Sequence, residues 1–151
     1  TNMEREKELS NEELNSMENM ADKLIGIKVL VVEDNLLNLE IVTEVLRERG
    51  LIVTAAENGQ IAVELFQNNP PGTFDVILMD IHMPVMGGME ATKIIRAMEH
   101  ADAQTIPILA LTANDFEEDI HGTREAGMND HLTKPFDMEK IFGALITHTR
   151  K

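Results

Sequence analysis

The sequence contains no cysteine, no tryptophan and no tyrosine. The absence of cysteine excludes a disulfide framework, a thiolate metal site and a cysteine nucleophile. A stacking surface for single-stranded nucleic acid would lack its usual aromatic residues. Basic side chains are scarce as well, with 13 Lys and Arg against 27 Asp and Glu and a formal net charge of −14. Because a phosphate backbone is bound by clustered basic groups, the composition argues against a nucleic-acid-binding protein.

Long apolar runs are also missing. No run approaches the roughly 18–20 apolar residues that a membrane span needs, and residues 1–26 are polar and acidic, unlike the apolar centre of a signal peptide. We therefore expect no membrane contact by this segment and a cytoplasmic location. With 43% hydrophobic residues in a chain of 151, the composition is that of one packed domain plus a tail.

Composition changes near Gly26, which divides the chain into two parts. Residues 1–26 form the predicted N-terminal extension, in which Ser10 to Glu13 has the pattern of a capping box and favours a helix start. A solvated helical linker is the first interpretation of this extension, and a signalling helix or dimer coil is the second. Residues 27–151 form the predicted folded domain.

The predicted domain alternates short β-branched apolar runs with amphipathic segments. The runs predict strands, and the amphipathic segments predict helices. The expected strands are 27–32, 51–56, 74–80, 106–112 and 130–133, and the expected helices are 38–49, 58–66, 89–99, 116–126 and 137–149. Strands that alternate with helices in this way form a parallel sheet covered on both faces. In such sheets, ligands bind at the carboxyl ends of the strands.

Polar residues at the predicted strand ends are few and chemically specific. They are Glu33 and Asp34 after the first strand, Asp80 at the end of the third, Thr112 at the end of the fourth and Lys134 after the fifth. If these groups converge, the carboxylates repel one another unless a cation lies among them. Oxygen ligands without cysteine favour Mg²⁺, with Mn²⁺ as the alternative.

Asp80 is the predicted nucleophile, because it is the lone acid at the tip of a predicted buried strand. A carboxylate can attack a phosphoryl group and form an aspartyl phosphate. Lys134 can hold the phosphoryl oxygens, and Thr112 can donate a hydrogen bond to them. The phosphate adds roughly −1.5 to −2 charge, so both groups can move toward it and switch the loops behind them.

Four sequence blocks resemble the signature blocks of response-regulator receiver domains. They are Val31–Asn35, Leu78–Pro84, Leu111–Ala113 and Lys134–Pro135, and they occur in the family's order. The resemblance covers about Ile27 to His148. Within it, residues 127–135 are most similar to receivers attached to hybrid sensor histidine kinases.

The resemblance implies a fold and a function. The fold is flavodoxin-like, a three-layer sandwich of five helices around a five-stranded parallel sheet of order 2-1-3-4-5. The function is phosphorelay signalling, in which Asp80 accepts a phosphoryl group from the phosphohistidine of a kinase core or a histidine phosphotransfer protein. The domain itself is then no classical enzyme, since it phosphorylates and dephosphorylates its own Asp80. The parent chain is expected to be a histidine kinase that can be anchored in the inner membrane.

The resemblance also implies which residues hold the metal and the phosphate. Asp80 is the phosphoacceptor, Asp34 binds Mg²⁺ directly, and Glu33 binds it mostly through water. The main-chain carbonyl of His82 completes the protein's share of the metal shell. His82 and Asn114 occupy the positions that tune how fast the family's aspartyl phosphate hydrolyses.

Switching residues are implied in the same way. Thr112 is the switch hydroxyl, Lys134 is the phosphoryl-binding cation, and a cis peptide bond is expected between Lys134 and Pro135. The family often has an aromatic residue three positions before the lysine, where this chain has His131. Many relatives also have Asp where Gly87 lies, which predicts a more flexible loop here.

Three alternatives remain open. The first is a stand-alone single-domain response regulator. The second is a phosphatase of the haloacid-dehalogenase type, whose second acid two residues after the nucleophile is here His82, which counts against it. The third is a receiver fold that is never phosphorylated, against which the intact set of acids and Lys134 count.

Two further groups of residues carry no chemistry in this interpretation. Three histidines lack the spacing of metal ligands and are predicted to lie on the surface: His100, His121 and His148. Three methionines follow the third predicted strand: Met83, Met86 and Met89. We expect them to pack in the loop and the core, with an adaptable partner-binding surface as the second interpretation.

Overall fold

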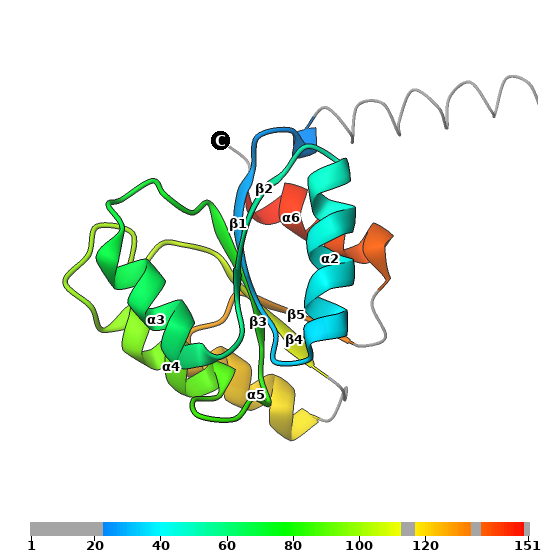
Figure 1. The fold of residues 1–151 in the computed structure, drawn as a ribbon. Coiled ribbons are helices and arrows are strands. Elements are labelled where there is room, and N and C mark those ends of the chain that lie inside the picture. The colour runs from blue at the N-terminus through cyan, green and yellow to red at the C-terminus, as the bar shows by residue number, and fades with distance from the viewer. Residues whose placement is uncertain (1–22, 113–116, 134–136, 150–151) are drawn as a thin grey trace, which may run out of the picture.

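The strands form one parallel sheet in the computed structural model, which describes residues 23–112, 117–133 and 137–149 (Figure 1). They are β1 (Lys28–Val32), β2 (Ile52–Ala56), β3 (Val76–Asp80), β4 (Ile108–Thr112) and β5 (Asp130–Thr133). Neighbouring strands pair in parallel in the order β2-β1-β3-β4-β5. The predicted fold class and strand order are therefore confirmed.

Helices cover the sheet on both faces. They are α2 (Leu36–Glu48), α3 (Gly59–Asn68), α4 (Gly88–Arg96), α5 (Glu117–Ala126) and α6 (Met138–His148). Figure 1 shows α2 and α6 on one side of the sheet and α3, α4 and α5 on the other. The three layers follow because the central strands β1, β3 and β4 are apolar and buried on both faces, so that both faces must be covered.

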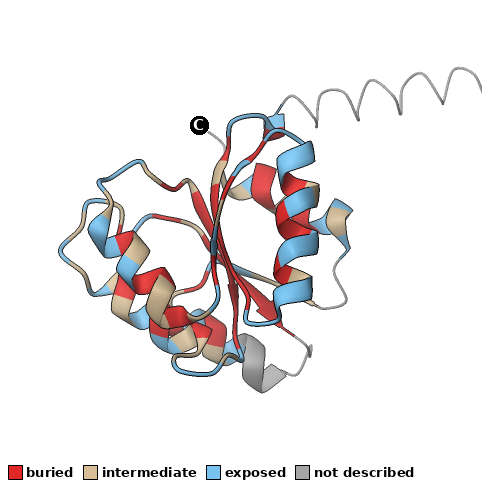
Figure 2. Cartoon of the chain, viewed as in Figure 1, coloured by how far each residue is buried: buried red, intermediate tan, exposed pale blue. Residues whose placement is uncertain are grey.

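Alternating side chains of each central strand supply two separate cores. Val29 and Val31 of β1 pack in the core beneath α2 and α6, whereas Leu30 and Val32 pack in the core beneath α3 and α4. The alternation follows from the two-residue period of a strand, which turns successive side chains to opposite faces. Figure 2 shows the result, a buried sheet between helices whose outer faces are exposed.

Most helix boundaries differ from the predicted ones by one to three residues, and local hydrogen bonds explain two of the differences. The first predicted helix, α2, begins at Leu36 rather than at residue 38, because Asn35 is its N-cap and accepts a hydrogen bond from the Asn38 N–H at 3.1 Å. Helix α4 ends at Arg96, three residues before its predicted end. There the Met98 N–H donates to the Ile95 carbonyl at 3.1 Å, a tight turn that ends the α-helical pattern.

The start of the described chain is packed onto the domain. Leu24, which belongs to the predicted N-terminal extension, is 1% exposed and lies in the core beneath α2 and α6. The Gly26 N–H donates to the Gly50 carbonyl at 2.9 Å. Gly50 has a φ of +91°, and a Cβ atom there would lie 3.0 Å from the Ile25 side chain. The boundary between residues 26 and 27 stays a prediction, and the packed core reaches at least to Leu24.

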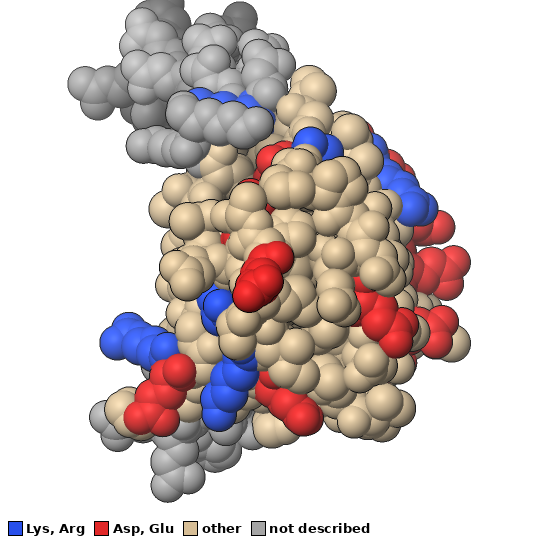
Figure 3. Space-filling view, turned by 90° about the vertical axis from the view of Figure 1, so that its left-hand side faces the viewer, with Lys and Arg blue, Asp and Glu red and all other residues tan. Residues whose placement is uncertain are grey.

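Charges are interspersed on the face that α3 and α4 cover. Figure 3 looks at this side of the molecule, where acidic and basic side chains stand among uncharged ones without forming one basic patch. In the part of the chain that the structure describes, no helix has both the length and the apolar character needed to cross a bilayer.

Candidate functional site

Three carboxylates from two strand ends meet at one edge of the sheet. Glu33 and Asp34 directly follow β1, and Asp80 is the last residue of β3, the neighbour of β1 in the sheet. One carboxylate oxygen of each residue lies within 4.8 Å of those of the other two. The sequence prediction that these acids converge is therefore confirmed.

Hydrogen bonds at the end of β1 fix the two acids that follow it. The Glu33 N–H donates to the Ala56 carbonyl of β2 at 3.1 Å, which continues the sheet pairing one residue further. Glu33 Oε1 accepts a hydrogen bond from the Asn35 N–H at 3.2 Å. Glu33 is 1% exposed, whereas Asp34 is exposed. One acid therefore lies inside the site while the other faces solvent at its rim.

Backbone hydrogen bonds of the next residue, Ile81, fix the position of Asp80 at the end of β3. Its strand is buried throughout, and Asp80 itself is 4% exposed. The next N–H, that of Ile81, donates to the Leu111 carbonyl of β4 at 3.1 Å, and the Gly88 N–H donates back to the Ile81 carbonyl at 2.9 Å. A Cβ atom on Gly88 would lie 2.1 Å from the Asp80 carbonyl oxygen. The first turn of α4 thus packs directly on the backbone of Asp80.

The electrostatics of this cluster favour a bound cation. Two unit charges 4.8 Å apart repel by roughly 3–4 kcal/mol at an effective dielectric constant of about 20. A hard divalent ion relieves this repulsion, and Mg²⁺ prefers oxygen ligands from one or two carboxylates together with water and phosphate. The donor set of Glu33, Asp34 and Asp80 is compatible with that preference.

The remaining predicted site residues are placed only in part. Thr112 ends β4, is 1% exposed and pairs with Thr133, the last residue of β5. His82 is exposed, and the metal-binding role of its carbonyl stays a prediction. Three predicted site residues lie outside the described residues, so their roles also stay predictions: Asn114, Lys134 and Pro135.

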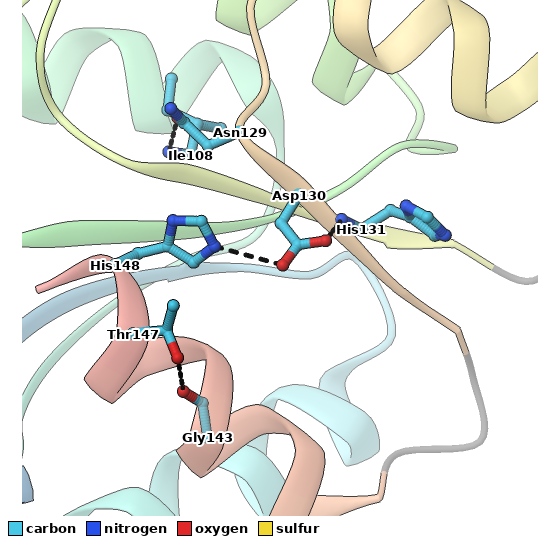
Figure 4. Close-up of polar contacts among 7 residues, drawn as sticks. All are labelled: Ile108, Asn129, Asp130, His131, Gly143, Thr147 and His148. Atoms are coloured by element: carbon cyan, nitrogen blue, oxygen red, sulfur yellow. Dashed lines mark hydrogen bonds and ion pairs between the residues drawn. The ribbon is translucent and has the colours of Figure 1, made fainter.

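The start of β5, which carries His131, is tied down by polar contacts (Figure 4). The Asn129 side chain accepts a hydrogen bond from the Ile108 N–H at 2.9 Å. The Asp130 carboxylate contacts His148 Nε2 at 3.1 Å and also accepts the His131 N–H at 2.8 Å. The His131 side chain extends away from the Asp130 carboxylate (Figure 4). The strand is therefore fixed at the end opposite to the acidic cluster.

The predicted surface position of three histidines is correct for one of them. The His121 side chain is 75% exposed and pairs with Glu125 on the next helical turn. His148 is half-buried against Asp130. His100 is also half-buried, with its ring centroid 4.3 Å from that of Phe66. No sequence signal marks the contacts of His148 and His100, because their partners are distant in the chain.

Sequence reasoning missed two residues that shape the surroundings of the site. Gly88 falls between the strand predicted at 74–80 and the helix predicted at 89–99; a glycine permits close backbone approach, but the sequence does not show which atoms come close. Arg96 was predicted only as a residue of a helix. Its guanidinium donates hydrogen bonds to the Gly127 and Ala103 carbonyls, both at 3.0 Å, and to Asn129 Oδ1 at 2.9 Å.

A family profile and similar curated proteins agree on the kind of domain that this chain resembles. The sequence profile of the response regulator receiver domain matches residues 29–146. The chain is 36% identical over 131 residues to hybrid signal transduction histidine kinase I of Dictyostelium discoideum, covering 85% of this chain and 8% of that protein. It is 37% identical over 123 residues to the sensor protein GacS of Pseudomonas syringae pv. syringae, covering 81% of this chain and 13% of that protein. The chain thus spans a small part of the length of these relatives.

Solved structures agree with the sequence comparison. The receiver domain of sensor histidine kinase PA1611 from Pseudomonas aeruginosa PAO1, which has a magnesium ion coordinated in its active-site cleft, is 38% identical with a TM-score of 0.69; the match covers 81% of this chain and 98% of that one. A second match is to a chain in the co-crystal structure of the Saccharomyces cerevisiae histidine phosphotransfer signalling protein Ypd1 and the receiver domain of its downstream response regulator Ssk1. The two chains are 32% identical with a TM-score of 0.73, and the match covers 83% of this chain and 90% of that one. The profile match, which reaches from β1 into α6, places the chain in the response regulator receiver domain family.

Proposed function

We propose that this receiver takes a phosphoryl group onto Asp80 from a phosphohistidine, with a magnesium ion held by Glu33, Asp34 and Asp80. The observation that carries the proposal is the meeting of these carboxylates within 4.8 Å at the strand ends. In the reaction, a carboxylate oxygen of Asp80 attacks the phosphorus and forms an O–P bond. The P–N bond to the donor histidine breaks, and its electron pair returns to the imidazole nitrogen.

The other predicted residues have supporting roles in this proposal. The bound ion supplies positive charge against the phosphoryl oxygens, and Mn²⁺ can take its place because it uses the same oxygen ligands. The His82 carbonyl completes the metal shell, and His82 and Asn114 tune hydrolysis of the product. Lys134, which follows Thr133 in the sequence, binds the phosphoryl oxygens, while Thr112 responds to them together with His131.

An exposed apolar patch supports a protein as the phosphoryl donor or acceptor. Helix α2 begins two residues after Asp34, and its first turns expose Leu36 by 62%, Leu37 by 65% and Ile41 by 47%. Large apolar side chains gathered on one exposed face commonly mark a protein interface. A solved complex pairs the Ssk1 receiver with the histidine phosphotransfer protein Ypd1, and we propose a partner of that class for this chain.

The parent of this receiver is, on our proposal, a hybrid sensor histidine kinase that acts in the cytoplasm. The support is that the similar curated proteins carry names such as hybrid signal transduction histidine kinase and sensor protein, while the chain spans only 8% and 13% of two of them. A stand-alone response regulator is less favoured for the same reason. A parent gene without a kinase core beside this receiver would contradict the hybrid origin.

The test is incubation of the chain with acetyl phosphate and Mg²⁺, followed by intact-mass measurement. We expect a gain of one phosphate that is lost in Asp80→Asn and abolished by EDTA. Asp75→Asn is a matched control, because Asp75 immediately precedes β3 and so lies at the end of the strand opposite to Asp80. Phosphorylation of Asp80→Asn, or catalytic turnover of a phosphomonoester by the wild-type chain, would contradict the proposal.

A further inference from the structure

Val85 combines a strained backbone with an exposed apolar side chain. Its φ is 71°, and it is the only non-glycine residue with a positive φ in the part of the chain that the structure describes. A β-branched residue rarely adopts this conformation, because its side chain crowds the neighbouring backbone. Val85 is also 81% exposed, more than the other exposed large hydrophobic residues. Packing inside the domain therefore does not explain why valine occupies this position.

The surrounding loop holds Val85 in its strained conformation. The Met86 N–H donates to the Pro84 carbonyl at 2.8 Å, and the Met86 carbonyl accepts the Gly59 N–H at 3.1 Å. Gly59 is pressed so closely to this loop that a Cβ atom there would lie 2.6 Å from the Met86 carbonyl oxygen. Strain of this kind persists where neighbouring contacts fix the backbone, and it concentrates at functional sites.

The loop that carries Val85 begins and ends at the proposed phosphoacceptor. It leaves β3 at Asp80 and returns to the same backbone, since the Gly88 N–H donates to the Ile81 carbonyl at 2.9 Å. Val85 lies near the middle of this closed loop. In Figure 1, the loop and the start of α2 lie at the same end of the sheet. A protein whose histidine reaches Asp80 must therefore lay its surface over this end.

We propose that Val85 is a specificity contact for a phosphohistidine-bearing donor protein, whose apolar surface beside the histidine packs on the Val85 side chain. This inference rests on the proposed phosphoryl transfer to Asp80. A small-molecule phosphoryl donor has no such surface, so Val85 contributes only when the donor is a protein. The exposed Leu36 and Leu37 at the start of α2 extend the same apolar contact on the β1 side of Asp80.

The test compares two phosphoryl donors on Val85→Asn, because asparagine tolerates a positive φ and removes the apolar side chain. The donors are acetyl phosphate and Ypd1 phosphorylated on its histidine, and the readout is phosphate on Asp80. We expect transfer from Ypd1 to fall at least about fivefold in kcat/KM, as for an interface residue worth more than about 1 kcal/mol. We expect the rate with acetyl phosphate to change by less than about twofold, and Tm to rise by roughly 2–8 °C as the strain is relieved.

Ile52→Thr is the matched control. Ile52 is 58% exposed but begins β2, at the opposite end of the sheet from Asp80, so its substitution should leave both rates unchanged. Equal losses with both donors in Val85→Asn, or no loss with Ypd1, would overturn the inference. So would wild-type phosphorylation by acetyl phosphate without any transfer from Ypd1. Failure of the wild type with both donors would instead overturn the proposed function.

Discussion

A single residue, Arg96, joins three segments of the chain at the end of α4. Its guanidinium donates to the carbonyls of Ala103 and Gly127 and to the Asn129 side chain, at 2.9 to 3.0 Å. Burial lowers the pKa of Arg96 from its ordinary value, because the charged group is partly removed from water. Asn129 Oδ1 also accepts the Ile108 N–H at 2.9 Å, so this contact reaches β4 and the start of β5.

Arg96→Met is predicted to destabilise the domain. The substitution keeps much of the aliphatic packing but removes three hydrogen bonds from a charged donor, so the free energy of unfolding should fall by about 2–4 kcal/mol. Urea denaturation checks this value. Lys93→Met is the control, since Lys93 is exposed on the same helix and should change stability by less than about 0.5 kcal/mol. Similar urea concentrations at the unfolding midpoint for the two variants would contradict the role given to Arg96.

Thr112 offers a test of switching that is separate from phosphorylation. It is buried at the end of β4, and valine matches its shape without the hydroxyl. We expect Thr112→Val to fold and to gain phosphate on Asp80, but to lose most of the spectral change that beryllofluoride causes in the wild type. Heteronuclear NMR of the helix α5 amides measures that change. Thr112→Ser keeps the hydroxyl and should therefore keep the spectral change. An equal spectral change in Thr112→Val and in the wild type would show that Thr112 is not part of the switch.

At the scale of secondary-structure elements, the first turn of α4 lies directly against the backbone of Asp80 at the end of β3. Gly88 begins α4, and a Cβ atom there would lie 2.1 Å from the Asp80 carbonyl oxygen and 2.8 Å from the Met79 side chain. Backbone cannot yield by that much without moving the helix. The approach of α4 to the phosphoacceptor therefore depends on the absence of a side chain at Gly88.

Gly88→Ala is predicted to destabilise the domain by about 1–3 kcal/mol, as expected for overpacking against backbone, and to slow phosphorylation by acetyl phosphate. Gly143→Ala is the matched control, because Gly143 lies inside α6 with nothing within 4 Å of an added Cβ atom. Alanine there should stabilise the domain by about 0.5–1 kcal/mol through its higher helix propensity. Thermal unfolding of both variants checks the opposite signs. A stabilised Gly88→Ala would show that α4 adjusts freely.

The elements that sequence predicted well are those whose signals are local. Apolar runs such as Val29–Val32 predict buried parallel strands. An acid at the end of such a run, as Asp80 is, indicates a site residue. Gly88, Arg96 and Val85 gave no comparable signal. Their roles depend on atoms brought close only by the fold, such as the Asp80 carbonyl against Gly88. Contacts of this kind have no sequence period, so they could not be predicted from the chain alone.

For the whole molecule, net charge and metal binding both change the free energy of unfolding. The chain has a formal net charge of −14, and such an excess destabilises the folded state through self-repulsion. The cluster of Glu33, Asp34 and Asp80 concentrates part of that repulsion within 4.8 Å. Ordinary salt screens the distributed charge, whereas a specifically bound divalent ion also neutralises the cluster.

Magnesium is therefore predicted to stabilise the domain beyond the effect of ionic strength. At a free concentration about 100-fold above its Kd, a ligand that binds only the folded state adds about 2.7 kcal/mol to the free energy of unfolding. Thermal unfolding in MgCl₂ against NaCl at matched ionic strength measures this increment. Asp34→Asn should raise Tm without magnesium, because one of the clustered charges is removed, and should lose most of the increment with it. An undiminished magnesium increment in Asp34→Asn would mean that the ion binds elsewhere, and the acidic cluster would then no longer account for metal binding by this receiver.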